Sequence, residues 1–381
     1  MEKDMPIFPQ EIITSILVRL PVKSLIRFQC VCKSWKNLFR TPSFIAEHLH
    51  HSTRQNPLLI VDSDVSGCIP WRLCLLNCEM EVSEFENTHI IDSLMSGCFY
   101  CCNHMLCKMS GWLYSSNGLL CVKFSRNSQD HLWLWNPSIR VVRQVPESLN
   151  EPKYFSVGFG FSPIIDDYKI VKFFLAGFSV VVQAEVYSLR TGLWRKVEVG
   201  NLEGVYDLGC GAFSWNGAIF WIGEKKDVEV HNKSHLELIV SFDIAGEVFT
   251  LIPFPTLNSA DSCYKRLASF ENKLALLFTS DIENSGSWAI DLWVLEECTD
   301  PSRERWSWAK IYTSTPNPCW ICAEIIWRNE IVCLVEAFEG EEGKVVLCNL
   351  TTNEFKPFGC SSRPGILEYV ESLVLLDNIH V

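Results

Sequence analysis

The densest group of potentially reactive side chains lies between residues 98 and 107. It reads CFYCCNHMLC and places four cysteines and one histidine within ten residues. Thiolate and imidazole groups at such short spacing are typical ligands of Zn²⁺. A structural zinc site usually takes two ligand pairs separated by a longer loop, and no clean second pair follows here. The group therefore fits a cysteine-rich surface loop better than a metal site.

A second cysteine pair, Cys319 and Cys322, has the C-x-x-C spacing of redox motifs. A redox-active pair needs a βαβ context and a helix N-terminus that lowers the pKa of the thiol. Here the pair follows Pro318 and enters a strand-like run, so we do not predict redox chemistry. The sequence also contains no G-x-S-x-G, no P-loop and no dinucleotide-binding glycine pattern. We therefore expect no catalytic residue, no cofactor and no metal.

Composition and charge narrow the class of protein. The chain has 381 residues, is 48% hydrophobic and 20% charged, and carries a net charge of −12. This is typical of a globular protein of up to two domains, and the negative charge argues against a general nucleic-acid binder. The longest apolar run, residues 173–182, is too short to span a bilayer, and the N-terminus does not resemble a signal peptide. We expect a soluble cytoplasmic or nuclear protein with reduced cysteines and no membrane partner.

The elements that would position a functional surface fall into two parts, and the first runs from Ile7 to Phe44. Apolar residues recur there at helical spacing in three short segments, with breaks at Pro21 and before Pro42. Three short helices make a core too small to stand alone without a partner. An apolar surface left over on such a unit is typical of a docking face. We expect a helical domain over residues 1–50, a linker over 51–57 and a second domain over 58–381.

The second domain repeats a pattern of strands and turns. A turn dipeptide precedes an apolar strand at intervals of roughly 50 to 57 residues, close to the kelch period. The dipeptides are Asn117-Gly118, Asp166-Asp167, Asn216-Gly217, Asn272-Lys273 and Asn329-Glu330. A further pair of strands follows each, so one unit holds four strands, and such units bury both faces only when they pack around an axis. The repeat predicts a β-propeller of about six blades, with residues 369–376 completing an early blade; a β-sandwich is the alternative.

Both parts resemble plant F-box proteins. The first part resembles the F-box in the residues FP (8–9), RLPVKSL (19–25), RF (27–28) and VCKSW (31–35). The second resembles the kelch-like, F-box-associated domain in SSNGLLCV, LWNPSIRVVRQVP and FSWNGAIFWIG. S-locus F-box proteins have a similar layout. The resemblance implies an α+β multidomain protein, with a small three-helix F-box followed by a mostly-β, kelch-like propeller.

The resemblance also implies function by docking. F-box proteins bind the Skp adaptor and through it a cullin–RING ubiquitin ligase, the SCF complex, and their second domain holds a target protein for ubiquitylation and proteasomal degradation. The residues implied to grip the adaptor are Pro9, Ile13, Leu17, Leu20, Pro21, Leu25, Val31, Cys32 and Trp35. The alternatives are an adaptor-binding scaffold without ligase output, and a propeller enzyme or metal-binding protein.

Overall fold

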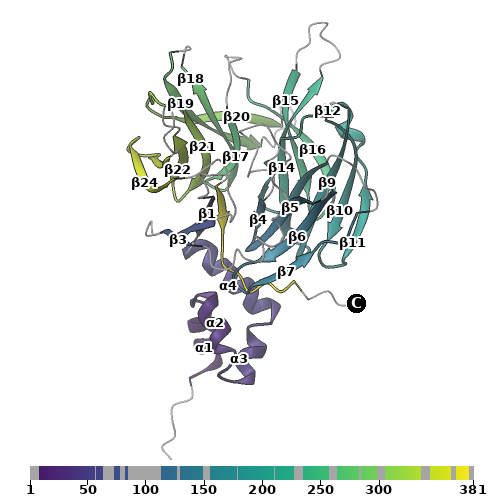
Figure 1. Cartoon of the computed structure of the whole chain (residues 1–381), viewed down its shortest axis with the longest axis vertical. Helices are drawn as coiled ribbons and strands as arrows, with labels where there is room; N and C mark the ends of the chain where they lie inside the picture. The colour runs from purple at the N-terminus through teal and green to yellow at the C-terminus, as the bar shows by residue number, and fades with distance from the viewer. Residues whose placement is uncertain are drawn as a thin grey trace, which may run out of the picture.

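The computed structural model consists of a small helical unit (residues 8–55) and a large β-domain (Figure 1). The helical unit lies at one end of the molecule, below the sheets in this view. The structure describes residues 8–55, 57–62, 73–77, 82–84, 113–126, 129–148, 155–177, 179–209, 211–226, 235–256, 264–282, 285–297, 305–335, 344–361 and 366–376.

Four helices form the helical unit: α1 (Gln10–Leu17), α2 (Val22–Phe28), α3 (Lys33–Leu38) and α4 (Pro42–Gln55). Pro9 and Pro21 occupy the N-cap positions of α1 and α2, where their extended backbone leads into the helix. Cys32 caps α3, because its Sγ accepts a hydrogen bond of 3.4 Å from the backbone N–H of Trp35. The helix starts therefore follow the breaks that the sequence predicts.

Helix α4 is the part of this unit that differs from the prediction. The sequence predicts three helices and a linker over 51–57, whereas α4 continues to Gln55 and β1 begins at Leu58. The buried positions of α4 are Phe44, His48, Leu49 and Ser52. Two of them, His48 and Ser52, are polar, so the apolar spacing that predicts a helix stops before the helix does. The buried face continues to Ser52, within the segment that the sequence predicts as a linker.

The β-domain contains six four-stranded antiparallel units in the part of the chain that is described. Units one to three are β25 (Leu367–Tyr369), β1 (Leu58–Asp62), β2 (Leu73–Leu76) and β3 (Val82–Glu84); β4 (Leu113–Ser116), β5 (Leu119–Arg126), β6 (Gln129–Asn136) and β7 (Val141–Gln144); and β8 (Phe155–Ser162), β9 (Asp167–Ala176), β10 (Val180–Ser188) and β11 (Leu193–Val197). Units four to six are β13 (Phe213–Trp215), β14 (Ala218–Lys226), β15 (His235–Asp243) and β16 (Val248–Pro253); β17 (Tyr264–Phe270), β18 (Lys273–Asp281), β19 (Trp288–Glu297) and β20 (Trp306–Thr313); and β21 (Ile321–Trp327), β22 (Glu330–Val335), β23 (Lys344–Asn349) and β24 (Phe355–Ser361). The short strand β12 (Val205–Tyr206) follows the 3-10 turn η1 (Gly200–Leu202) and pairs with both β10 and β14, which joins units three and four into one sheet.

The six units form a closed ring. The first strand of each unit contacts the first strand of the next, in the order β25, β4, β8, β13, β17, β21 and back to β25. Strand β25 comes from the C-terminal end and pairs with β1, with Leu58 opposite Tyr369. The described strands thus make a six-bladed propeller that the C-terminal strand closes, as the sequence predicts. The strand ends at Tyr369, however, and residues 370–376 contain none.

The hairpin turns of the blades are those that the repeat marks. At Asn117-Gly118 both turn residues have positive φ values, 45° and 77°, and Asn and Gly adopt this conformation at the lowest cost. Asn216-Gly217 repeats the geometry at 48° and 76°. In the last two repeats the positive-φ pairs are residues 271–272 and 328–329, one position before the predicted dipeptides.

Aromatic side chains fill the space between neighbouring blades. Trp221 on β14 is fully buried, and the ring of Phe173 meets it edge-on at 5.0 Å between centroids. Gly158 on β8 lies against the same indole, and a Cβ there would come within 2.1 Å of Trp221 Cζ2. Close packing of this kind fixes the position of one blade relative to the next.

Candidate functional site

The nine residues implied to grip the adaptor separate into buried and accessible sets. Leu17 and Leu25 are 2% and 0% exposed and lie in the helical core with Val18, Val22, Phe39 and Phe44. They hold the helices together and do not reach the surface. Both residues belong to the helical core in this structure, and their contact with an adaptor stays a prediction.

The other seven residues remain accessible to different degrees. Ile13, Leu20 and Trp35 are half-buried and pack against the helical core. Pro9, Pro21, Val31 and Cys32 are exposed, and Val31 is 62% exposed although it is apolar. Val31 is therefore the one member of the nine that is a large exposed hydrophobic residue.

Four further apolar side chains of the helical unit are exposed: Phe8 (63%), Ile12 (47%), Ile16 (56%) and Ile26 (38%). Together with Val31 we call them the exposed apolar set. They make up five of the eleven large exposed hydrophobic residues in the described part of the chain. The sequence showed Ile12 and Ile16 at helical spacing. The pattern does not say which side of a short helix faces the core, so both were missed as surface residues.

Residues 370–376, which we call the C-terminal strap, hold the helical unit against the propeller. Leu373 is 3% exposed and packs in the helical core, and Ile139 of the second blade packs against the same cluster. The carboxylate of Glu371 accepts a hydrogen bond of 3.2 Å from the backbone N–H of Val22 at the start of α2. Desolvation raises the pKa of Glu371, although this hydrogen bond and the charge of Lys23 oppose the rise.

The C-terminal strap is itself fixed to the second blade. The side-chain amide of Asn136 donates hydrogen bonds to the Ser372 carbonyl (3.1 Å), the Ser372 hydroxyl (3.0 Å) and the Val374 carbonyl (2.9 Å). Gly118 lies against the C-terminal strap, and a Cβ at this position would come within 2.3 Å of Ser372 Cβ. Arg143 donates to the Leu376 carbonyl at 3.0 Å. The strap thus bridges a blade and the helices, so the two units are held in one orientation.

His48 on α4 supplies a second fixed point of the helical unit. The side chain is 1% exposed, and its Nε2 lies 2.9 Å from the carbonyl oxygen of Leu20. Because a carbonyl only accepts, Nε2 carries the proton. Desolvation lowers the pKa of His48 below its ordinary value, so the buried ring is neutral.

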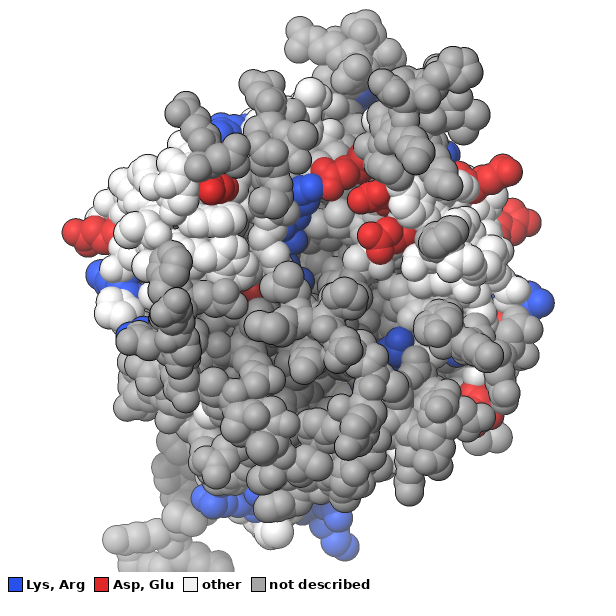
Figure 2. All heavy atoms as spheres, turned by 45° about the horizontal axis from the view of Figure 1, so that its top comes forward, with Lys and Arg blue, Asp and Glu red and all other residues white. Residues whose placement is uncertain are grey.

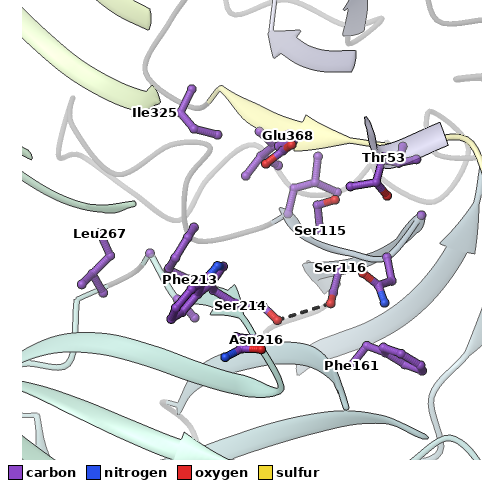
Figure 3. Close-up of a pocket in the computed structure, with 18 of the residues that line it drawn as sticks. Thr53, Ser115, Ser116, Phe161, Phe213, Ser214, Asn216, Leu267, Ile325 and Glu368 are labelled. Carbon is purple, nitrogen blue, oxygen red and sulfur yellow. Dashed lines mark hydrogen bonds between the residues drawn. The ribbon is translucent and has the colours of Figure 1, made fainter. Parts of the chain in front are cut away.

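A cavity of about 370 Å³ lies at the centre of the propeller (Figure 3). Its wall takes residues from the innermost strands of all six blades, and Thr53 of α4 lies on it as well. The hydroxyls of Ser116 and Ser214 meet across it at 3.3 Å, as the dashed line marks. Its charged lining residues among those described are Arg266, Glu324 and Glu368.

The carboxylate of Glu324 is the centre of a polar network in this wall. The Glu324 side chain is 2% exposed and pairs with Arg266 Nη2 at 3.2 Å. It also accepts hydrogen bonds from the Tyr264 hydroxyl (3.0 Å) and the Cys322 thiol (3.2 Å). Burial, followed by the charge of Glu324, raises the pKa of Cys322, which opposes thiolate formation in the C-x-x-C pair.

The described residues can be compared with the requirements of a metal site and of a membrane-spanning helix. These residues contain no group of three or more His, Cys, Asp or Glu side chains placed to hold a metal ion. The cysteine-rich segment 98–107 lies outside them. No helix in the same part of the chain is long and apolar enough to cross a membrane.

Comparisons with known proteins agree with this two-part architecture. A model of the F-box domain matches residues 5–46, and a model of the F-box associated beta propeller domain matches residues 81–364. An F-box/kelch-repeat protein of Arabidopsis thaliana is 25% identical over 82% of this chain and 82% of its own length. A putative F-box protein of the same plant is 27% identical over 78% of this chain and 76% of its own length.

Solved structures match only loosely. The polysaccharide lyase Uly1 gives a TM-score of 0.43 at 8% identity over 69% of this chain and 83% of that one, which is too low to carry an argument. The two domain matches support a general role as a substrate receptor of an SCF ligase, and proteins of this type are generally non-catalytic adaptors. The chain belongs to the family of F-box proteins that carry an F-box-associated β-propeller domain.

Proposed function

We propose that this protein binds the Skp adaptor through its helical unit and a target protein through its propeller, and so directs the target to ubiquitylation and proteasomal degradation. We assign adaptor binding to residues 1–50 and target binding to residues 58–381. The observation that carries the proposal is the exposed apolar set, which extends from Phe8 before α1 through α1 and α2 to the turn after α2. Large apolar side chains gathered on a small unit in this way are typical of a protein–protein interface.

The complex acts by bringing the target protein close to the enzyme that transfers ubiquitin. The adaptor and cullin place a charged conjugating enzyme near the target, which raises the effective concentration of a target lysine. The C-terminal strap supports this function, because it holds the helical unit and the propeller in one orientation. The free, buried thiols of Cys121, Cys333 and Cys348 support a reducing compartment, and we place the protein in the cytoplasm or nucleus.

The test replaces two members of the exposed apolar set without changing the helical core. An Ile16→Asp/Val31→Asp double variant changes two exposed positions, whereas Leu20, whose carbonyl binds His48, is left intact. Each buried interface anchor is worth about 2 kcal/mol, so we expect each change to weaken adaptor capture about 30-fold. Leu193→Asp is the matched control, because Leu193 is 69% exposed on β11, in the propeller.

Pull-down of adaptor and cullin by the full chain is the measurement. The proposal predicts capture by the wild type and by the Leu193 variant, and loss of capture by the double variant. Equal capture by all three proteins would show that the exposed apolar set does not bind the adaptor. Capture without turnover of any bound protein in cells would identify a scaffold instead of a ligase receptor.

A further inference from the structure

Glu368 is the charged group of the central cavity that pairs with no other group in the described part of the chain. Glu368 lies on β25, and it lines the cavity together with Ile366, Leu367 and Val370, whereas Tyr369 is buried. The Glu368 side chain is exposed to the cavity, and its carboxylate makes no hydrogen bond or ion pair within the described structure. Figure 3 shows it on the C-terminal strand, across the open space from Phe213 and Ile325.

The other described lining residues do not neutralise this carboxylate. Arg266 is the one cationic residue among the described lining residues, and its guanidinium is held by Glu324 at 3.2 Å. Two carboxylates and one guanidinium leave the lining with a net charge of −1. The surrounding protein desolvates Glu368 and raises the pKa of its carboxyl group. Keeping a desolvated carboxylate ionised costs free energy unless a cation forms an ion pair with it.

The rest of the described cavity wall is largely apolar and can pack against the aliphatic part of a ligand. Phe213, Leu267, Ile325 and Ile366 present apolar surface to the cavity, and the volume of about 370 Å³ lies in the range of ligand-binding pockets. Thr53 of α4 lies on the wall, so the helical unit bounds part of the cavity. The end of the molecule opposite the helices is hollowed and carries both acidic and basic side chains (Figure 2).

We propose that the central cavity binds an alkylammonium or alkylguanidinium group, with the Glu368 carboxylate as its counter-ion and the apolar wall around its stem. The ion pair places the positive charge beside Glu368, while Arg266 and Glu324 stay paired with each other. The identification of this cation as the lysine or arginine side chain of a target protein rests on the proposed function. A free organic cation has the same chemistry.

The experiment measures binding to the purified full chain by isothermal titration. One arm uses an arrayed library of capped heptapeptides with a central arginine or lysine, each matched by the same peptide with norleucine. The other arm uses agmatine, a free alkylguanidinium. The variants are Glu368→Gln, which removes the charge at nearly constant shape, and Glu198→Gln, an exposed glutamate on the outer edge of the third blade.

We expect cationic peptides to bind more tightly than their norleucine partners, and Glu368→Gln to weaken that binding about tenfold or more while Glu198→Gln does not. Binding of agmatine with equal affinity would identify a small-molecule site, and binding of peptides alone would identify a target side chain. Equal affinity of cationic and neutral ligands, or an unchanged Glu368→Gln variant, would overturn the inference. Adaptor capture is measured on the same variants, so failure here with capture retained leaves the proposed function intact.

Discussion

The C-terminal strap makes the stability of the helical unit depend on a residue at the other end of the chain. Leu373 is 3% exposed in a core that it shares with Leu17, Val22 and Phe44. Leu373→Ala removes buried carbon atoms and leaves a cavity, and changes of this type cost 2–5 kcal/mol, about 3 kcal/mol in the middle of the range. A loss of about 3 kcal/mol corresponds to about 150-fold in an equilibrium constant.

Hydrogen exchange of the full-length protein tests this value. The amides of α2 and α4 should lose protection by up to about 150-fold in Leu373→Ala, because they report opening of the helical core. The amides of β18, on the fifth blade, should keep theirs. Leu376→Ala is the matched control: Leu376 belongs to the same segment and is 1% exposed, but it packs in the cluster of the second and third blades. That change should leave the helices protected.

The reasoning would be refuted by unchanged exchange in α2 and α4 of Leu373→Ala. Such a result would mean that the helical unit holds its fold without the strap. Equal loss of protection in both variants would also contradict it, because the effect would then come from displacement of the whole segment rather than from the Leu373 side chain.

Three further predictions concern Gly158, His48 and Glu368. Gly158→Ala places a Cβ 2.1 Å from Trp221 Cζ2 and should lower the urea midpoint by the equivalent of about 1–3 kcal/mol, whereas Gly200→Ala, with no atom within 4 Å, should not. Because the folded-state pKa of His48 is lowered below 6.5, its stabilising effect is present above that pH and is lost as the pH falls through it. Exchange protection of α4 should therefore drop between about pH 7 and pH 5.5 by more than that of β18. The folded-state pKa of Glu368 is raised above 4.5, so its ionised form costs stability at neutral pH; Glu368→Gln should raise the thermal midpoint at about pH 7 and make no difference near pH 4.

Local patterns in the sequence determined most of the architecture. Helical spacing located α1 and α2, the break at Pro21 separated them, and the turn dipeptides located the hairpins of five blades. Both signals are local, since a turn such as Asn117-Gly118 needs only its own residues to favour positive φ. The repeat then implied a ring, because a four-stranded unit cannot bury both faces alone.

Only the tertiary structure decided which faces of these helices and strands contact one another. Helical spacing placed Leu17 and Ile16 beside each other, yet the first is buried and the second exposed, because the packing partners come from other helices and from Leu373. Asn136 and Ser372 are brought together across 236 positions of the sequence, and no periodic signal connects them. The position of Glu368 in the central cavity, where it pairs with no other described residue, has the same origin. Its surroundings come from six blades, so its charge environment exists only once the ring has closed.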